Sequence, residues 1–105
     1  MKFQNDTYLS VPDALVDADG EWIDLRLCLG VAFTITGTGS ASGDVSLMGS
    51  NDREAEVEIS SVPVDASQAV GANSPDLFWS YIRFKYVAGA SGAGTVTVKA
   101  TIKGA

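Results

Sequence analysis

The stretch Phe78–Ile102, FWSYIRFKYVAGASGAGTVTVKATI, holds two alternating segments joined by a glycine-rich connection. In the first segment, the odd positions from Trp79 to Val87 include the two basic residues Arg83 and Lys85. The even positions from Phe78 to Tyr86 are mostly aromatic or apolar. In residues 95–102, apolar residues alternate with threonine and lysine. A period of two is typical of β-strands, and β-branched and aromatic residues suit a pleated sheet. The stretch therefore predicts a long β-hairpin with a glycine-rich tip.

Shorter segments with the same pattern precede it. A strand is predicted at Trp22–Leu29, and Gly30 is expected to end it before another extended segment at Val31–Thr36. Asp44–Gly49 predicts a further short strand, and Arg53–Ile59 predicts one more because its residues alternate strictly. Residues 60–75 are rich in proline and small residues, so we expect a loop with one short strand near 61–65 or 68–70.

The segment Arg53–Ile59 assigns its residues to two faces. Ala55, Val57 and Ile59 are predicted to face inward, and the three glutamates between them to form a solvated outer face that protects a sheet edge. Ser50–Asp52, just before it, predicts a turn, since Asx side chains bond to nearby backbone groups.

Chain length and strand count define the expected architecture. A chain of 105 residues is most simply one domain with one core. Residues 1–20 are expected to form an extended N-terminal arm with a short strand, and residues 21–105 a β-sandwich domain. With about seven or eight strands and no convincing helix, the chain is predicted to be all-β, a single antiparallel β-sandwich or jelly roll.

The inventory of reactive side chains is small. The chain has no histidine, which excludes Ser-His-Asp and Cys-His catalysis and the usual zinc sites. Cys28 is the one cysteine, so no disulfide forms within the chain, and we expect a free buried thiol. The acidic residues between Asp13 and Glu21 lack the spacing of a calcium loop and are interpreted as a solvated turn. We therefore predict no catalytic, metal-binding or cofactor-binding residue, and no enzyme.

Charge is unevenly distributed along the chain. Residues 1–60 carry eleven acidic against three basic residues, net −8, and residues 61–105 carry two against four, net +2. An acidic balance disfavours nucleic acid as a partner, because phosphate binding needs clustered lysine and arginine. No apolar run approaches the length of about 20 residues that crosses a bilayer, so no membrane partner is expected, and the N-terminus lacks the apolar run of a secretory signal.

The aromatic residues supply the candidate contacts. Trp79 and Tyr81 share a predicted strand face with Arg83 and Lys85, which makes that face amphipathic and typical of an interface. If the sandwich buries this face instead, the outward set is Phe78, Ile82, Phe84 and Tyr86. The aromatic residues Trp22, Trp79, Tyr81 and Tyr86 also allow a sugar-stacking platform. The complete set of predicted interface residues is Tyr8, Leu9, Trp79, Tyr81, Arg83 and Lys85.

The sequence DVSLMGSND at 44–52, followed by YIRFKY at 81–86, a small-residue loop and GTVTV at 94–98, resembles small β-sandwich virion proteins of tailed bacteriophages. The N-terminal arm and the strand Trp22–Leu29 are similar to those of capsid cement proteins. A discoidin-like sandwich carries a related SND pattern, but there glycine normally follows, where this chain has Arg53.

This resemblance implies a head decoration or cement protein. Its expected partner is the major capsid protein, and we expect it to form a dimer or trimer on the capsid exterior after synthesis in the host cytoplasm. The N-terminal arm is expected to reach a neighbour and pair there as an added strand. The alternative is a carbohydrate-binding or adhesive module of a phage tail or cell surface.

Overall fold

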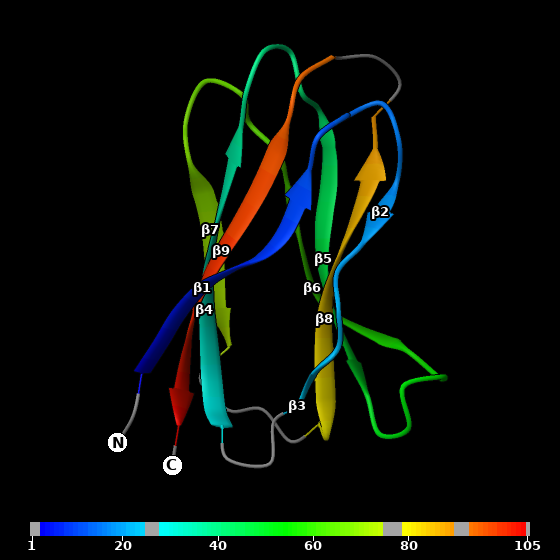
Figure 1. Cartoon of the computed structure of the whole chain (residues 1–105), viewed down its shortest axis with the longest axis vertical. Coiled ribbons are helices and arrows are strands. Elements are labelled where there is room, and N and C mark those ends of the chain that lie inside the picture. The colour runs from blue at the N-terminus through cyan, green and yellow to red at the C-terminus, as the bar shows by residue number, and fades with distance from the viewer. Residues whose placement is uncertain (1–2, 25–27, 75–78, 90–92, 105) are drawn as a thin grey trace.

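The computed structural model describes residues 3–24, 28–74, 79–89 and 93–104, and these residues form a sandwich of two antiparallel sheets with nine strands (Figure 1). Sheet A has the spatial order β1 (Phe3–Val11), β9 (Val96–Gly104), β4 (Cys28–Gly37), β7 (Val70–Ser74). Sheet B has the order β2 (Ala18–Asp19), β8 (Tyr81–Ala88), β5 (Gly43–Ser50), β6 (Val57–Pro63), and β3 (Ile23–Asp24) also pairs with β8. The predicted all-β sandwich is confirmed, and no helix that could cross a membrane occurs in the described ranges.

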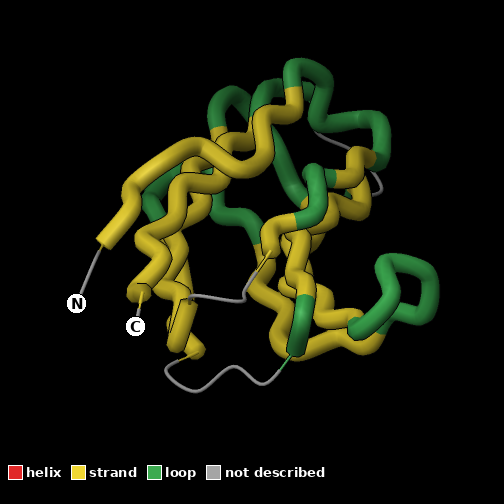
Figure 2. Tube along the Cα trace, turned by 60° about the horizontal axis from the view of Figure 1, so that its bottom comes forward, coloured by secondary structure: helices red, strands yellow, loops and turns green. Residues whose placement is uncertain are grey.

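The predicted hairpin of residues 78–102 is wrong in its pairing, although both of its strands exist. β9 lies between β1 and β4 in sheet A, whereas β8 lies between β2 and β5 in sheet B. The connection between them therefore passes from one sheet to the other, and the two layers are separate in Figure 2. Alternation indicates which side chains are buried, but it does not select the hydrogen-bonding partner of a strand.

The core lies between the two sheets and is filled by the inward residues of both. Its buried members are Leu9, Val11, Ala14, Val31, Phe33, Ile35, Ala41, Val45, Leu47, Ile82, Phe84, Tyr86, Val96, Val98, Ala100 and Ile102. Phe33 of sheet A meets Phe84 of sheet B with ring centroids 5.0 Å apart, in an edge-on arrangement that aromatic pairs favour. Even positions of β8 face this core, which is one of the two assignments that the alternation allows.

The two glycine-rich connections meet at one end of the sandwich. Thr38 and Thr95 exchange backbone and side-chain hydrogen bonds, and the Ser40 amide donates to the carbonyl of Ala93. Gly94 has a φ of 149°, and a Cβ there would lie 2.0 Å from the carbonyl oxygen of Thr38. Both sheet-to-sheet connections thus depend on small residues for their close approach.

The N-terminal residues belong to the sandwich of their own chain. β1 pairs antiparallel with β9 over most of its length, with a register shift between Thr7 and Leu9. Leu9 and Val11 are buried in the core. The segment predicted as an arm of residues 1–20 therefore supplies an edge strand of sheet A and, through β2, a short edge of sheet B.

Two predicted strand boundaries are wrong. The predicted strand Trp22–Leu29 is divided between two sheets, since Ile23–Asp24 form β3 of sheet B and Cys28 begins β4 of sheet A, and residues 25–27 lie outside the described ranges. Gly30 does not end a strand, because β4 runs through it and a register shift between Cys28 and Gly30 accommodates it. The side chain of Cys28, predicted to be a buried thiol, lies outside the described part of the chain.

The strand predicted at Arg53–Ile59 begins only at Val57. Asp52 Oδ1 accepts hydrogen bonds from the amides of Glu54 and Ala55, so these residues form a turn rather than an extended strand. Ala55 and Val57 are exposed instead of buried, and only Ile59 packs against the core. In place of one short strand near 61–65 or 68–70, β6 continues to Pro63 and β7 runs from Val70 to Ser74.

Candidate interaction surface

The outer face of sheet B carries a cluster of aromatic and charged side chains, which we call the β8 surface. It consists of Trp22, Arg53, Glu56, Tyr81, Arg83 and Lys85. Tyr81, Arg83 and Lys85 point outward because they alternate along β8 with buried residues. The alternation therefore predicts these three positions correctly, and each of the three side chains is half-buried.

Aromatic rings and guanidinium groups stack along this surface. The guanidinium carbon of Arg83 lies 4.5 Å from the ring centroid of Trp22, and that of Arg53 lies 5.1 Å from the ring of Tyr81. The two rings meet edge-on with centroids 6.5 Å apart. Such cation–π contacts favour a fixed arrangement, and each covers one face of an aromatic ring.

Glu56 holds the two cations of β8 together. Its carboxylate accepts a hydrogen bond from Arg83 Nε and another from Lys85 Nζ at 3.1 Å, and Lys85 also lies 3.8 Å from Asp19. The hydrogen bond from Arg83 is the main reason why the pKa of Glu56 lies below its usual value, against the opposing effect of burial. The glutamate predicted to be solvated is thus 16% exposed and neutralises part of the surface.

The loop before β6 fixes the position of Arg53. Ser50 is fully buried, and its Oγ accepts hydrogen bonds from the amides of Asp52 and Arg53. The bonds that Asp52 accepts from the Glu54 and Ala55 amides lower its pKa. Arg53 has a φ of 65°, a conformation that a non-glycine residue adopts only where its surroundings impose it. The predicted Asx turn is confirmed, and the loop projects from sheet B (Figure 2).

Trp79 does not share the outer face with Tyr81, so this part of the predicted surface is wrong. Its indole lies over Gly49 on the side of β5 that faces the interior, since Gly49 pairs with the buried Ile82. A Cβ at Gly49 would lie 2.6 Å from Trp79 Cγ. Trp79 therefore packs against the core between the sheets. Because β8 begins only at Tyr81, its alternation does not extend to Trp79.

The other two predicted interface residues lie in β1. Leu9 is 5% exposed and belongs to the core, so it carries no part of a contact surface. Tyr8 is half-buried, with its ring 6.5 Å from that of Phe84. Tyr86, a member of the alternative sugar platform, is buried, and its hydroxyl lies within hydrogen-bond distance of the carbonyls of Ala14 and Ser42. Burial is the main cause that raises the pKa of Tyr86.

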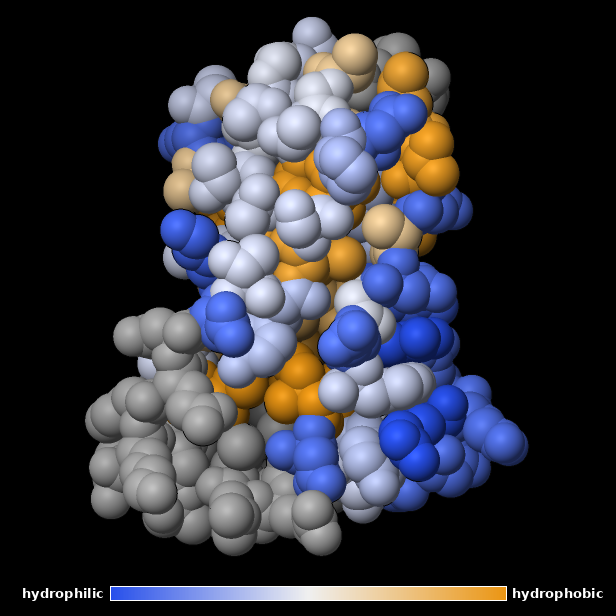
Figure 3. Space-filling model, in the orientation of Figure 1, coloured by the Kyte–Doolittle hydropathy of each residue, from blue (hydrophilic) through white to orange (hydrophobic). Residues whose placement is uncertain are grey.

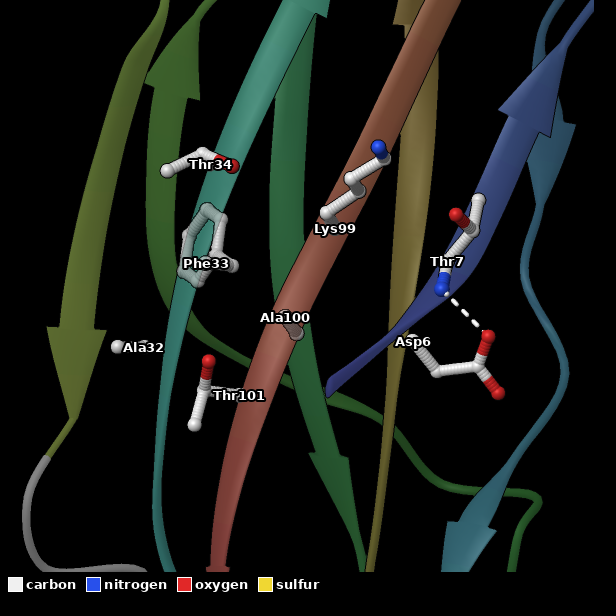
Figure 4. Close-up of a pocket in the computed structure, with 8 residues that line it drawn as sticks. All are labelled: Asp6, Thr7, Ala32, Phe33, Thr34, Lys99, Ala100 and Thr101. Atoms are coloured by element: carbon white, nitrogen blue, oxygen red, sulfur yellow. Dashed lines mark hydrogen bonds between the residues drawn. The ribbon is translucent and has the colours of Figure 1, made fainter. Parts of the chain in front are cut away.

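The outer face of sheet A is different in kind. It carries an open hollow of about 490 Å³, lined mainly by alanine and threonine, with Lys99 and Asp6 as its charged groups. Figure 4 shows Thr34 and Lys99 on neighbouring strands and Asp6 on the far side of β1 from β9. The hollow offers hydroxyl groups and one cation but no exposed aromatic ring.

The acidic residues 13–21 serve local structure. Asp17 accepts a hydrogen bond from the amide of Ala88, and Asp13 accepts one from the amide of Leu15. In the ranges that the structure describes, no group of three acidic, histidine or cysteine residues is arranged to hold a metal ion.

Sequence reasoning missed Arg53 and Glu56 as members of this cluster, and it grouped Trp22 with Tyr81 only in the alternative sugar platform. Trp22 lies in the connection between β2 and β3, whereas Arg53 and Glu56 both lie in the connection between β5 and β6, and the two connections meet because the strands bring them to one face. An arginine in a turn directly after an Asx pair was the one usable signal, since it suggests a fixed loop.

No protein-family model and no curated protein sequence matches the chain. Its fold is similar to that of the SPBc2 prophage-derived protein YomS, with a TM-score of 0.72 and 16% identity over 96% of this chain and 92% of that one. The PBSX exported protein XepA matches with a TM-score of 0.76 and 15% identity over 97% of this chain but 37% of its own. A protein of Bacillus endospore appendages, described as disulfide-linked pili, matches with a TM-score of 0.61 and 8% identity over 98% and 89% of the two chains. The chain therefore shares its sandwich fold with a prophage-derived protein, a PBSX exported protein and a protein of endospore appendages.

Proposed function

We propose that this chain is a non-enzymatic bacteriophage structural protein that decorates the exterior of the capsid and stabilises it through contacts with the major capsid protein. The observation that carries the proposal is the β8 surface, where tryptophan, tyrosine and arginine are held in place on an outer sheet face. These residue types dominate the binding energy of protein interfaces. The fold shared with prophage-derived proteins supports a phage setting.

The mechanism is surface burial with orientation by charge. Trp22 and Tyr81 supply apolar area, while Arg53 and Arg83 offer donors to carboxylates or carbonyls of the partner. The contacts with Glu56 and the rings fix these long side chains before binding, which reduces the entropy that an interface loses on association. A dimer or trimer on the capsid would multiply this contact.

A carbohydrate-binding or adhesive module is the rival function, because Trp22 and Tyr81 lie together on the surface. Guanidinium groups already cover one face of each ring, which disfavours stacking of a sugar there. Trp79 packs against the core, so it is not a stacking ring for an external sugar.

Binding of the purified protein to capsids that lack it tests the proposal. We expect co-sedimentation with these capsids, and Trp22→Ala should weaken it by at least about tenfold, as expected for a hot-spot residue. Lys99→Ala and Thr34→Ala, on the outer face of sheet A, are the matched controls and should bind as the unaltered protein does.

Failure of the unaltered protein to bind, together with unchanged heat stability of capsids made without it, would overturn the capsid proposal. Binding to a glycan array that Trp22→Ala abolishes would favour the rival. Circular dichroism of each variant separates loss of contact from loss of fold.

A further inference from the structure

We infer that the groove between β1 and residues 19–23 accepts an extended segment of a different protein, which carries lysine or arginine and pairs with residues 3–7 of β1 on the edge opposite β9. The inference extends the proposed function and rests on it for the setting in which such a segment is met. Within that setting it assigns a second contact, which adjoins the β8 surface at Trp22, and gives its chemistry.

The groove has a volume of about 570 Å³ and two walls, Asp6–Ser10 of β1 and Asp19–Ile23 of sheet B. The walls come together at Gly20, where a Cβ would lie 2.9 Å from the carbonyl oxygens of both Tyr8 and Phe84. Figure 3 shows apolar side chains at the bottom of a furrow on this side of the molecule, with polar side chains on both sides of it. This shape and volume are in the range of ligand-binding sites in proteins.

β1 offers a backbone edge along this groove. In the described part of the chain β1 pairs with β9 on one side only, and its register is regular from Phe3 to Thr7. β1 is the longest edge strand with nine residues: β2 and β3 have two residues each, β7 has five, and β6 has seven with a register shift and a terminal proline. Long, regular edges are usually protected or covered, and strand addition is one way to cover them.

The hydrogen-bonding direction of this edge follows from Thr7. Its amide donates to Asp6 Oδ1 at 2.7 Å, and Figure 4 shows that bond on the side of β1 away from β9. Because alternate residues of a strand direct their amides to the same side, the amide of Asn5 faces that side too. An added strand would replace the Asp6 carboxylate at the Thr7 amide and leave that carboxylate for a cation of the incoming segment.

Charge selects the occupant. Asp6, Asp19 and Glu21 line the groove, and no lysine or arginine does, although Asp19 also lies 3.8 Å from Lys85 of the neighbouring β8. Residues 1–24 carry six carboxylates against one lysine, net −5 of the total −6. None of the edge strands β1, β2, β3, β6 and β7 contains lysine or arginine, so a second copy of this chain has no basic strand edge to offer. A basic segment of another protein fits the groove better.

The test is a titration of the isotope-labelled protein with a short blocked peptide that alternates lysine and valine, followed by amide chemical shifts. We expect shifts in residues 3–10 and 19–23, and none with a peptide that has glutamate in place of lysine. Asn5→Pro removes an outward amide without removing a bond to β9 and should weaken binding at least about tenfold, since an edge position tolerates proline.

Glu21→Gln alters charge alone and should weaken binding about two- to fivefold, the usual strength of one exposed ion pair. Glu54→Gln is its matched control, with the same change of net charge outside the groove, and should bind as the unaltered protein does. Absence of shifts in the groove, or equal shifts with the glutamate peptide, would overturn the inference. The readout is independent of capsid binding, so either result leaves the proposed function to its own test.

Discussion

The strands β8 and β9 have similar inner sides and different outer sides. Both direct a row of apolar residues into the core, Ile82 and Phe84 in one case and Val96 and Val98 in the other. On the outside β8 presents tyrosine, arginine and lysine with partners from two connections, whereas β9 presents threonine and Lys99. The inner sides hold the sandwich together, and the outer sides differ in what a partner could recognise. The comparison therefore separates residues that stabilise the fold from residues available for binding.

The largest effect is expected from the inner side of β8. Phe84→Ala removes a fully buried ring that contacts Phe33 across the sandwich, and it should lower the free energy of unfolding by about 3–5 kcal/mol. Denaturant titration measures this loss in the free energy of unfolding. Lys99→Ala on the outer side of β9 should change stability by less than about 0.5 kcal/mol. Equal losses in the two variants would contradict the assignment of inner and outer sides.

A medium effect is expected at Gly49, which tests the position of Trp79. Gly49→Ala places a methyl group against the indole and should destabilise the protein by about 1–3 kcal/mol. In a Trp79→Ala background the same substitution should cost much less, because the clash is gone. Additive losses of stability in this double-mutant cycle would contradict the contact between Trp79 and Gly49.

The smallest effect concerns Glu56 and pH. The bond from Arg83 depresses the pKa of Glu56 in the folded state, so the stability that this carboxylate contributes is present above its unfolded pKa and is lost as pH falls through the folded pKa. Glu56→Gln should therefore lower the free energy of unfolding by about 0.2–1 kcal/mol at neutral pH, and it should have no effect at a pH below the folded-state pKa of Glu56. Unfolding measured across this pH range checks it, with Glu54→Gln as the exposed control. A cost that does not change with pH would exclude the ion pair as its cause.

Much of the fold was predictable because burial leaves a local pattern. The alternation of residues 81–88 and 96–102 predicts both strands and groups the residues that share a face, whereas the structure decides that the even positions of β8 are the buried ones. It does not predict that the strands lie in different sheets, since a strand that buries one face looks the same on either layer of a sandwich. Strand ends were harder to predict: a single carboxylate, Asp52, turns a strictly alternating segment into a loop.

The candidate site was predictable only in part. Tyr81, Arg83 and Lys85 follow from the strand pattern, because period two assigns them to one face. Trp79 precedes the strand and packs against the core instead. Glu56 and Trp22 joined the surface through contacts between distant segments, which no local pattern encodes.

The sequence by itself determined an all-β chain, the sets of residues that share a face on its main strands, and a row of aromatic and basic residues on the most regular of them. Each of these is a local property, fixed by side-chain period and hydrophobic burial. Only the tertiary structure decided that β8 and β9 belong to opposite sheets, that Trp22 and Glu56 complete the β8 surface, and that β1 forms an acidic edge. These depend on which strand edges meet, and backbone hydrogen bonding at an edge is nearly independent of sequence.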